Sequence, residues 1–299
     1  MPVVATPAPA AATTAPAAAT PGPNMAAQPE FILAEAEFKA GNNTAAINDF
    51  GQAIQLDPGF LASYLDRGNA EVRLGQFDDA IVDFSRIVKA DPNNAIAYSN
   101  RGAAYGQLGE NNLALADLRR ASAQSPKDAM TEYNLASAEG QSGDLKGALA
   151  DMNKSVANGP SVYTYRGRAV IESALGNQKS AIKDISVAMK LNVANPALLA
   201  DRAMFYQRSH LYPAALADYG AAIKLAPMVA QYRLLRAQTD LFAKDVTGAI
   251  SDLRAARQTL SGAGDDVAVA NIDRAIKVLT AKAHAASSPA PAPKATPQG

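Results

Sequence analysis

The stretch that decides the fold is residues 61–94, LASYLDRGNAEVRLGQFDDAIVDFSRIVKADPNN. Apolar residues recur at three- and four-residue spacing in both halves, which gives each half the buried stripe of an amphipathic helix. Gly75 can adopt the positive φ of a tight turn between the halves. Pro92 cannot continue the second helix. The stretch is therefore predicted to be a helical hairpin.

This hairpin pattern is repeated along the chain. A proline ends each copy and a glycine precedes it by about seventeen residues. The prolines are Pro58, Pro92, Pro126 and Pro160, and the glycines are Gly41, Gly75, Gly109 and Gly143. A fixed period of this length indicates one supersecondary unit, copied so that each copy buries its apolar face against the next.

The repeated positions resemble the tetratricopeptide repeat, a family of helix–turn–helix units of this length. In the stretch above, the family's small, Gly, Ala, aromatic and Pro positions are Gly68, Gly75, Ala80, Phe84 and Pro92. The pattern covers residues 27–260 in seven units, although the later units match less well. The resemblance implies an all-α fold, a right-handed superhelical α-solenoid of about seven repeats. One more amphipathic helix, at 265–283 within a segment 261–284, is predicted to cap the array with a polar outer face.

The ends of the chain differ in composition from the repeats. Residues 1–26 and 285–299 are rich in Ala and Pro, so we expect disorder with polyproline II character in both segments. No export signal is visible after Met1, and no apolar run is long enough to cross a membrane. The expected compartment is periplasmic or extracellular if a signal precedes Met1, and cytoplasmic otherwise. Such tails suggest tethering or spacing, for example in a bacterial envelope.

The composition argues against several classes of chemistry. The chain carries 28 basic and 28 acidic side chains, so no net field attracts nucleic acid, and it has no Cys. Its two histidines, His210 and His284, are far apart in the sequence and give no metal-ligand cluster. His210 stands at the place of a turn glycine and is predicted to be a turn residue. We therefore predict no enzyme activity, no metal and no cofactor.

Charged residues recur beside the packing positions. Each predicted second helix carries an Asp and most first helices carry an Arg. The two sets are Asp49, Asp83, Asp117, Asp151, Asp184, Asp218 and Asp252, and Arg67, Arg101, Arg166, Arg202 and Arg236. They could pair within a unit or between neighbouring units. Pairing within units leaves more Asp side chains without a partner, so we expect each Asp to pair with the Arg of the next unit, and Asp252 with Arg274 of the cap.

The resemblance also places a binding surface. In this family the first helices line a concave groove that takes extended or helical segments of partner proteins. The groove positions carried over by register include Phe31, Phe38, Asn69, Arg73, Gln107, Tyr133, Gln141, Arg168, Met204 and Arg208. The carboxylate clamp of some family members is not expected here, since only Asn69 and Asn100 match it.

The sequence thus predicts a monomeric, non-catalytic scaffold that binds a protein or peptide, without nucleic acid and without a membrane span. The alternative is a structural protein that assembles through the ends of its array, for example in a bacterial envelope. The connection before Pro160 is short and the one before Pro196 is long. This irregularity predicts a change of curvature that divides the array at about residue 160.

Overall fold

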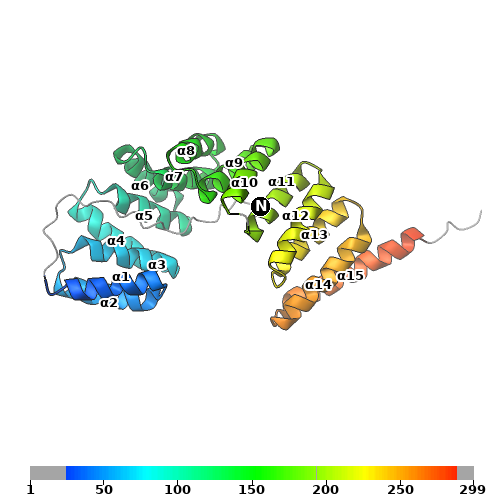
Figure 1. The fold of residues 1–299 in the computed structure, drawn as a ribbon, viewed down its shortest axis with the longest axis horizontal. Coiled ribbons are helices and arrows are strands. Elements are labelled where there is room, and N and C mark those ends of the chain that lie inside the picture. Colours follow the sequence, from blue (N-terminus) through cyan, green and yellow to red (C-terminus); the bar gives the residue numbers. More distant parts are fainter. Residues whose placement is uncertain (1–24, 193, 288–299) are drawn as a thin grey trace, which may run out of the picture. The chain divides into compact units, whose positions relative to one another are not determined.

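The computed structural model describes residues 25–192 and 194–287, and these residues form fifteen α-helices (Figure 1). From Gln28 to Ala174, and separately from Gln178 to Ser287, helices that follow each other in the sequence pack side by side in the solenoid order that the repeat pattern predicts. The helices are α1 Gln28–Ala40, α2 Asn43–Leu56, α3 Leu61–Arg73, α4 Phe77–Ala90, α5 Ala95–Gln107, α6 Asn111–Gln124, α7 Ala129–Ser142, α8 Leu145–Asn158, α9 Val162–Ala174, α10 Gln178–Leu191, α11 Pro196–Arg208, α12 Tyr212–Leu225, α13 Ala230–Phe242, α14 Val246–Gly262 and α15 Asp266–Ser287.

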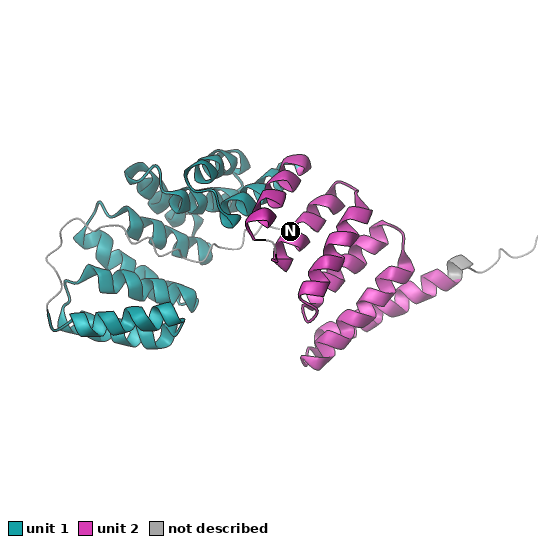
Figure 2. Ribbon diagram, in the orientation of Figure 1, with its two compact units in different colours: residues 1–177 teal, residues 178–299 magenta. Residues whose placement is uncertain are grey.

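The chain falls into two compact units, residues 1–177 and residues 178–299 (Figure 2). The first unit contains α1 to α9, and the second contains α10 to α15. The division lies inside the fifth repeat, between Asn177 and Gln178, and not at residue 160 where the short connection predicted it. Around residue 160, α8 and α9 stay packed against each other in the first unit.

Each hairpin turns at a residue with positive φ. Glycine occupies this place in the first five repeats, with φ between 76° and 92°. In the sixth repeat His210 takes the place, with φ 57°, which confirms its prediction as a turn residue. In the seventh, Lys244 adopts φ 65°. The turn geometry is therefore kept even where glycine is lost.

The two helices of a hairpin approach each other closely at the small residue of the first helix. A Cβ atom added at Gly68 would lie 2.7 Å from the Phe84 ring, and one added at Gly102 would lie 2.7 Å from Leu118. In other repeats Ala fills this place, as Ala34 does beside the buried Phe50. Small residues let the large side chain of the second helix fill the space between the helices.

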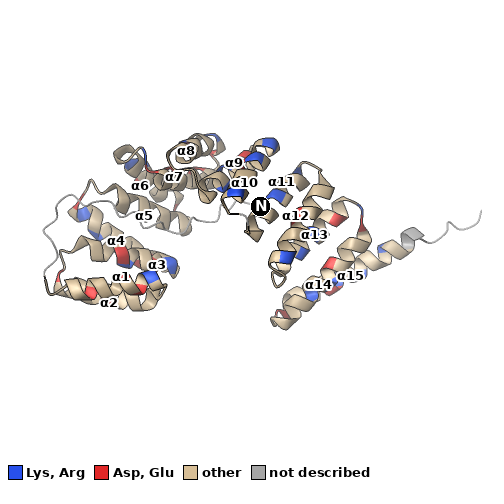
Figure 3. Ribbon diagram, in the orientation of Figure 1, with Lys and Arg blue, Asp and Glu red and all other residues tan. Residues whose placement is uncertain are grey.

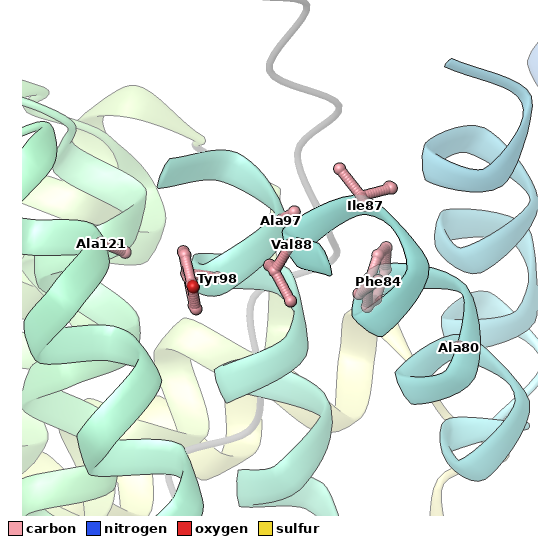
Figure 4. Close-up of a cluster of buried hydrophobic side chains, with 7 residues drawn as sticks. All are labelled: Ala80, Phe84, Ile87, Val88, Ala97, Tyr98 and Ala121. Atoms are coloured by element: carbon pink, nitrogen blue, oxygen red, sulfur yellow. The ribbon is translucent and has the colours of Figure 1, made fainter. Parts of the chain in front are cut away.

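The buried side chains connect one repeat to the next. In one cluster, Ala80, Phe84, Ile87 and Val88 of α4 pack with Ala97 and Tyr98 of α5 and with Ala121 of α6 (Figure 4). Tyr64, Leu65 and Val72 of α3 pack against the same cluster. In the second unit, Ala230, Ala256 and Ile272 join α13, α14 and α15 in the same way. Each hairpin therefore completes its core with its neighbour, as expected for a solenoid.

The helix predicted as a cap is α15, and it is longer than predicted. It has 22 residues and continues to Ser287, into the segment expected to be a disordered tail. The remaining residues of both predicted tails, 1–24 and 288–299, lie outside the described residues. No helix among the described residues combines the length and hydropathy that a membrane span requires.

Candidate functional site

The first helices of neighbouring repeats lie against one another in the first unit. Contacts join α1 to α3, α3 to α5, α5 to α7 and α7 to α9. Polar side chains bridge these helices. Arg73 donates to the Phe38 carbonyl at 3.1 Å, Asn100 donates to the Asn69 side chain at 2.9 Å, and Thr131 donates to Ser99 at 3.0 Å. We call the surface along these helices the first-helix face.

Three residues predicted to contact a partner are not exposed on the first-helix face. Phe38 is 7% exposed and lies under the guanidinium of Arg73, which is 3.6 Å from the ring centroid. Asn69 and Tyr133 are each 4% exposed. These side chains therefore offer little accessible surface to a partner. Their role in partner binding stays a prediction.

The other predicted residues are partly or fully accessible. Phe31 is half-buried against Phe50 and Phe60, with ring centroids 5.6 and 4.7 Å away. Arg168 is half-buried and donates to Asn153 of α8 at 3.1 Å. Among the predicted site residues of the first unit, Arg73, Gln107 and Gln141 are exposed. In the second unit, described separately, Met204 is half-buried and Arg208 is exposed.

The sequence prediction missed residues that share the face with the two glutamines. Asn134 and the glycines Gly106 and Gly140 are half-exposed on α5 and α7. Gly106 and Gly140 precede Gln107 and Gln141 by one residue, so both pairs recur at the repeat length. This recurrence is the sequence signal by which these residues could have been predicted as part of the surface. We call Asn100, Gln107, Asn134 and Gln141 the amide strip.

Helices α5 and α7 place no exposed charged side chain beside the amide strip. The only charged residue of α5 is Arg101, whose guanidinium is bound to Asp117. The charged residues of α7 are Glu132 and Glu139, and both are buried. Their carboxyl groups lie against the second helices, where Ser122 donates to Glu132 at 2.8 Å and Arg119 is 3.6 Å from Glu139. The surface therefore offers amide groups without charge.

Arginine–aspartate pairs connect the first and second helices of four hairpins. Arg67 binds both carboxylate oxygens of Asp83 at 2.7 Å. The same two-pronged bond joins Arg101 to Asp117, Arg202 to Asp218 and Arg236 to Asp252, at 2.6–2.9 Å. The hydrogen bond to the carboxylate raises the pKa of each of these Arg side chains. Such two-pronged bonds are among the stronger polar interactions in proteins.

These pairs lie within a repeat, so the predicted pairing between neighbours is wrong. Asp252 binds Arg236 and not Arg274. The prediction was based on how many Asp residues each scheme leaves without an Arg. It was misled because other side chains bind the Asp residues that lack an Arg. Lys154 binds Asp151 at 2.6 Å, and Gln52 donates to Asp49 at 3.4 Å. The Arg still reaches the previous repeat with its free nitrogen, as Arg101 does when it donates to Ser85 at 3.0 Å.

Two carboxyl groups of the first helices lie beside these Asp residues, in surroundings that disfavour a negative charge. Glu71 and Glu139 are each 6% exposed, and one oxygen of each has no hydrogen-bond partner among the described residues. Burial, reinforced by Asp83, raises the pKa of Glu71 to about 7. Burial, reinforced by Asp151, raises the pKa of Glu139 to about 7 as well. Below about pH 7, both groups are therefore mainly protonated in the folded chain.

Comparisons with known proteins agree with this geometry. Residues 68–109 match the family model described as TPR repeat, and residues 99–163 match the one described as Tetratricopeptide repeat. Together with the hairpin architecture of the other helices, these matches establish the chain as a tetratricopeptide repeat protein. No curated protein sequence matches the chain.

Several solved structures share the fold. A tetratricopeptide repeat protein from Parabacteroides merdae is 20% identical, with a TM-score of 0.63, over 86% of this chain and 100% of its own. PilF of Pseudomonas aeruginosa is 15% identical, with a TM-score of 0.57, over 72% and 96%. YrrB, described as a TPR protein with an unusual peptide-binding site, is 17% identical, with a TM-score of 0.50, over 64% and 97%. At these identities the likeness concerns the fold alone.

The Arg–Asp pairs can be tested by a double-mutant cycle. Arg67→Leu and Asp83→Asn should each lower the free energy of unfolding, and their effects should be coupled by about 1–3 kcal/mol because each removes the same bond. Urea denaturation of the single and double variants measures this coupling. The matched control is the cycle of Asp83→Asn with Arg101→Leu, whose effects should add. Coupling in the control cycle and not in the first would contradict pairing within a repeat and support pairing between neighbouring repeats.

The buried carboxyl groups predict a pH dependence of stability. The pKa of Glu71 is about 7 in the folded chain against an ordinary 4.5. Between these values the unfolded chain loses the proton first, so this group lowers stability as the pH rises from about 4.5 to about 7. Glu71→Gln should therefore stabilise the protein at pH 8 and change little at pH 4, as measured by urea denaturation. A gain that is equal at both pH values, or shared by Glu30→Gln at the start of α1, would contradict this cause.

Proposed function

We propose that this protein is a non-catalytic scaffold that binds an extended segment of a partner protein along the first-helix face of its first unit. Tetratricopeptide repeat proteins are in general protein-binding scaffolds, which sets the class of function. The observation that carries the specific proposal is the uncharged amide strip, which recurs on α5 and α7. Each of its amide groups offers both donors and an acceptor.

An extended peptide has the chemistry that suits this strip. Its backbone presents an N–H and a C=O at almost every residue, and each needs a partner when it leaves water. Gly106 and Gly140 precede Gln107 and Gln141 and are half-exposed, and a Cβ added at either would meet Ala114 or Ala148 of the second helix at 4.0 or 3.9 Å. Recognition of the backbone by amide groups, with a few side-chain contacts at positions such as Arg73, is one of the recurring modes of peptide binding.

The charges at the N-terminal end of the face disfavour capture of a free carboxylate. Asp66 and Glu35 lie on neighbouring first helices, and burial together with Glu35 raises the pKa of Asp66 to about 6. The Asn69 side chain, one of the two asparagines that match the clamp pattern, is already bound to Asp66 and to Asn100. The nearby cations are already engaged, since Lys39 is 3.7 Å from Glu35 and Arg73 donates to the Phe38 carbonyl, so a carboxylate terminus would meet these acidic groups without a free cation.

The proposal is tested by partner capture with variants of the strip. Replacing Gln107 and Gln141 with Lys should abolish or weaken at least tenfold the binding of any segment bound by backbone hydrogen bonds, because it removes two acceptors and introduces charge. The matched control replaces Gln52 and Gln55, on the exposed side of α2, with Lys. Bands that wild type and control retain and the strip variant loses identify the ligand. Capture that is unchanged in the strip variant would place binding elsewhere.

A further inference from the structure

The fourth hairpin, formed by α7 and α8, lacks the arginine that binds the Asp of four other hairpins. In its place stands Leu135, which is 4% exposed and packs with Leu118 of α6. The Asp of this hairpin, Asp151, is buried, and Lys154 binds its oxygen Oδ1 at 2.6 Å. No arginine among the described residues binds Asp151. The arginines that bind the equivalent Asp elsewhere are Arg67, Arg101, Arg202 and Arg236. The fourth hairpin therefore joins its helices in another way.

A second buried carboxyl group faces Asp151 instead. Glu139 of α7 is 6% exposed, and its oxygen Oε2 has no hydrogen-bond partner among the described residues. This oxygen lies at the first turn of α8, 3.0 Å from the point where a Cβ atom on Gly147 would stand. Asp144 lies at the same turn and already accepts from the Gly147 N–H at 2.9 Å. The start of α8 thus gives Glu139 a further carboxylate neighbour and no donor.

The cations beside this carboxyl pair balance it poorly. They are Arg119 of α6, which is 3.6 Å from Glu139, and Lys154, which binds Asp151. Both are more than half exposed, so water screens their charge. On α7 itself, Glu132 adds a third buried carboxyl group. In α5 and α9 the charged residues are engaged elsewhere: Arg101 binds Asp117, Arg166 lies beside Tyr133, Arg168 donates to Asn153 and Glu172 accepts from Asn177. Figure 3 shows the charged positions on these helices.

A proton on Glu139 removes the conflict between the two carboxyl groups. Ionised carboxylates only accept hydrogen bonds, whereas a protonated carboxyl group also donates one. A proton on Oε2 of Glu139 gives this oxygen a bond to Asp151 and removes one of the two negative charges. Burial, reinforced by Asp151, raises the pKa of Glu139 to about 7. The second hairpin differs, since Arg67 already binds both oxygens of the Asp83 that lies beside Glu71.

We propose that a proton held between Glu139 and Asp151 joins α7 to α8 in the role that an arginine has in other hairpins, so that the fourth hairpin is sensitive to pH. An arginine keeps its charge at neutral pH, whereas this proton is lost. The Glu139 carboxyl group has its ordinary pKa of 4.5 in the unfolded chain and a pKa of about 7 in the folded chain. The hairpin therefore loses stability as the pH rises between these values. The proposal concerns the fold of one hairpin and does not depend on the function proposed for the first-helix face.

Hydrogen exchange of the full chain, followed by mass spectrometry at pH 5 and pH 8, tests this proposal. The third hairpin, α5 and α6, is the internal reference, because Arg101 and Asp117 hold it at both pH values. After correction for the intrinsic effect of pH on exchange, the protection of α7 and α8 relative to this reference should fall about tenfold or more between pH 5 and pH 8. Glu139→Gln should abolish this fall, because the Gln amide can donate to Asp151 at both pH values.

The matched control is Glu37→Gln, at the same repeat position on α1, where the carboxylate accepts from Asn42 at 2.6 Å. This variant should keep the pH dependence of the fourth hairpin unchanged. Leu135→Arg supplies the missing arginine and should reduce the pH dependence, although it removes the packing of Leu135 with Leu118.

The proposal can be overturned by the exchange data or by a direct titration. An equal loss of protection in the third and fourth hairpins overturns it, as does a pH dependence that survives Glu139→Gln. The side-chain carboxyl carbon of Glu139, followed by NMR in the wild-type chain, should titrate with a midpoint near 7. A midpoint near the ordinary 4.5 also overturns the proposal.

Discussion

The close approach of the two helices in each hairpin is the constraint on which the rest of the structure depends. The first helix carries Gly or Ala at the crossing point, and the second helix carries a large side chain that fills the space. A buried Phe84 or Leu118 then reaches the next repeat, so the core of one hairpin becomes part of its neighbour's core. No hairpin buries its own apolar surface completely, which is why the unit occurs as an array.

The same approach fixes the polar groups around it. With the helices this close, an Arg one residue before the small residue reaches the Asp one residue before the large side chain, and the two-pronged bond follows. The crossing also sets how the first helices meet, and their contacts create the surface that carries the amide strip. The candidate binding surface is thus a consequence of packing, and its specificity comes from the few residues that packing leaves exposed.

The sequence was sufficient to predict most of the architecture. The period, the turn glycines and the small residues at the crossing point each reflect a local requirement, so seven hairpins and a final helix could be predicted from them. His210 could be identified as a turn residue because it interrupts a regular series. The extent of α15 was missed because the Ala/Pro tail was treated as one segment, although Ala-rich sequence favours helix until the first Pro, Pro289, approaches.

The pairing of charges and the exposure of single residues could not be predicted in the same way. In a periodic sequence, each Asp has a similar separation in sequence from the Arg of its own repeat and from the Arg of the next repeat. Only the three-dimensional packing shows which of the two it binds. Phe38 and Asn69 are both buried, because Arg73 of the next first helix lies over the Phe38 ring and Asn100 of the next first helix binds the Asn69 side chain. The position of a residue in the repeat shows on which face of the helix it lies. It does not show whether a residue of the neighbouring helix covers its side chain. This limit applies mainly to sites formed between repeats.

The most direct test of the central constraint compares two glycines on the same helix by urea denaturation. At Gly102, an added Cβ would lie 2.7 Å from Leu118 and 3.1 Å from the Ala114 carbonyl oxygen; at Gly106 the nearest contact is an ordinary 4.0 Å. Gly102→Ala should destabilise the protein, whereas Gly106→Ala should stabilise it by about 0.5–1 kcal/mol, because Ala favours helix more than Gly. If both substitutions stabilise the protein equally, close approach at the small residue does not hold the hairpins together.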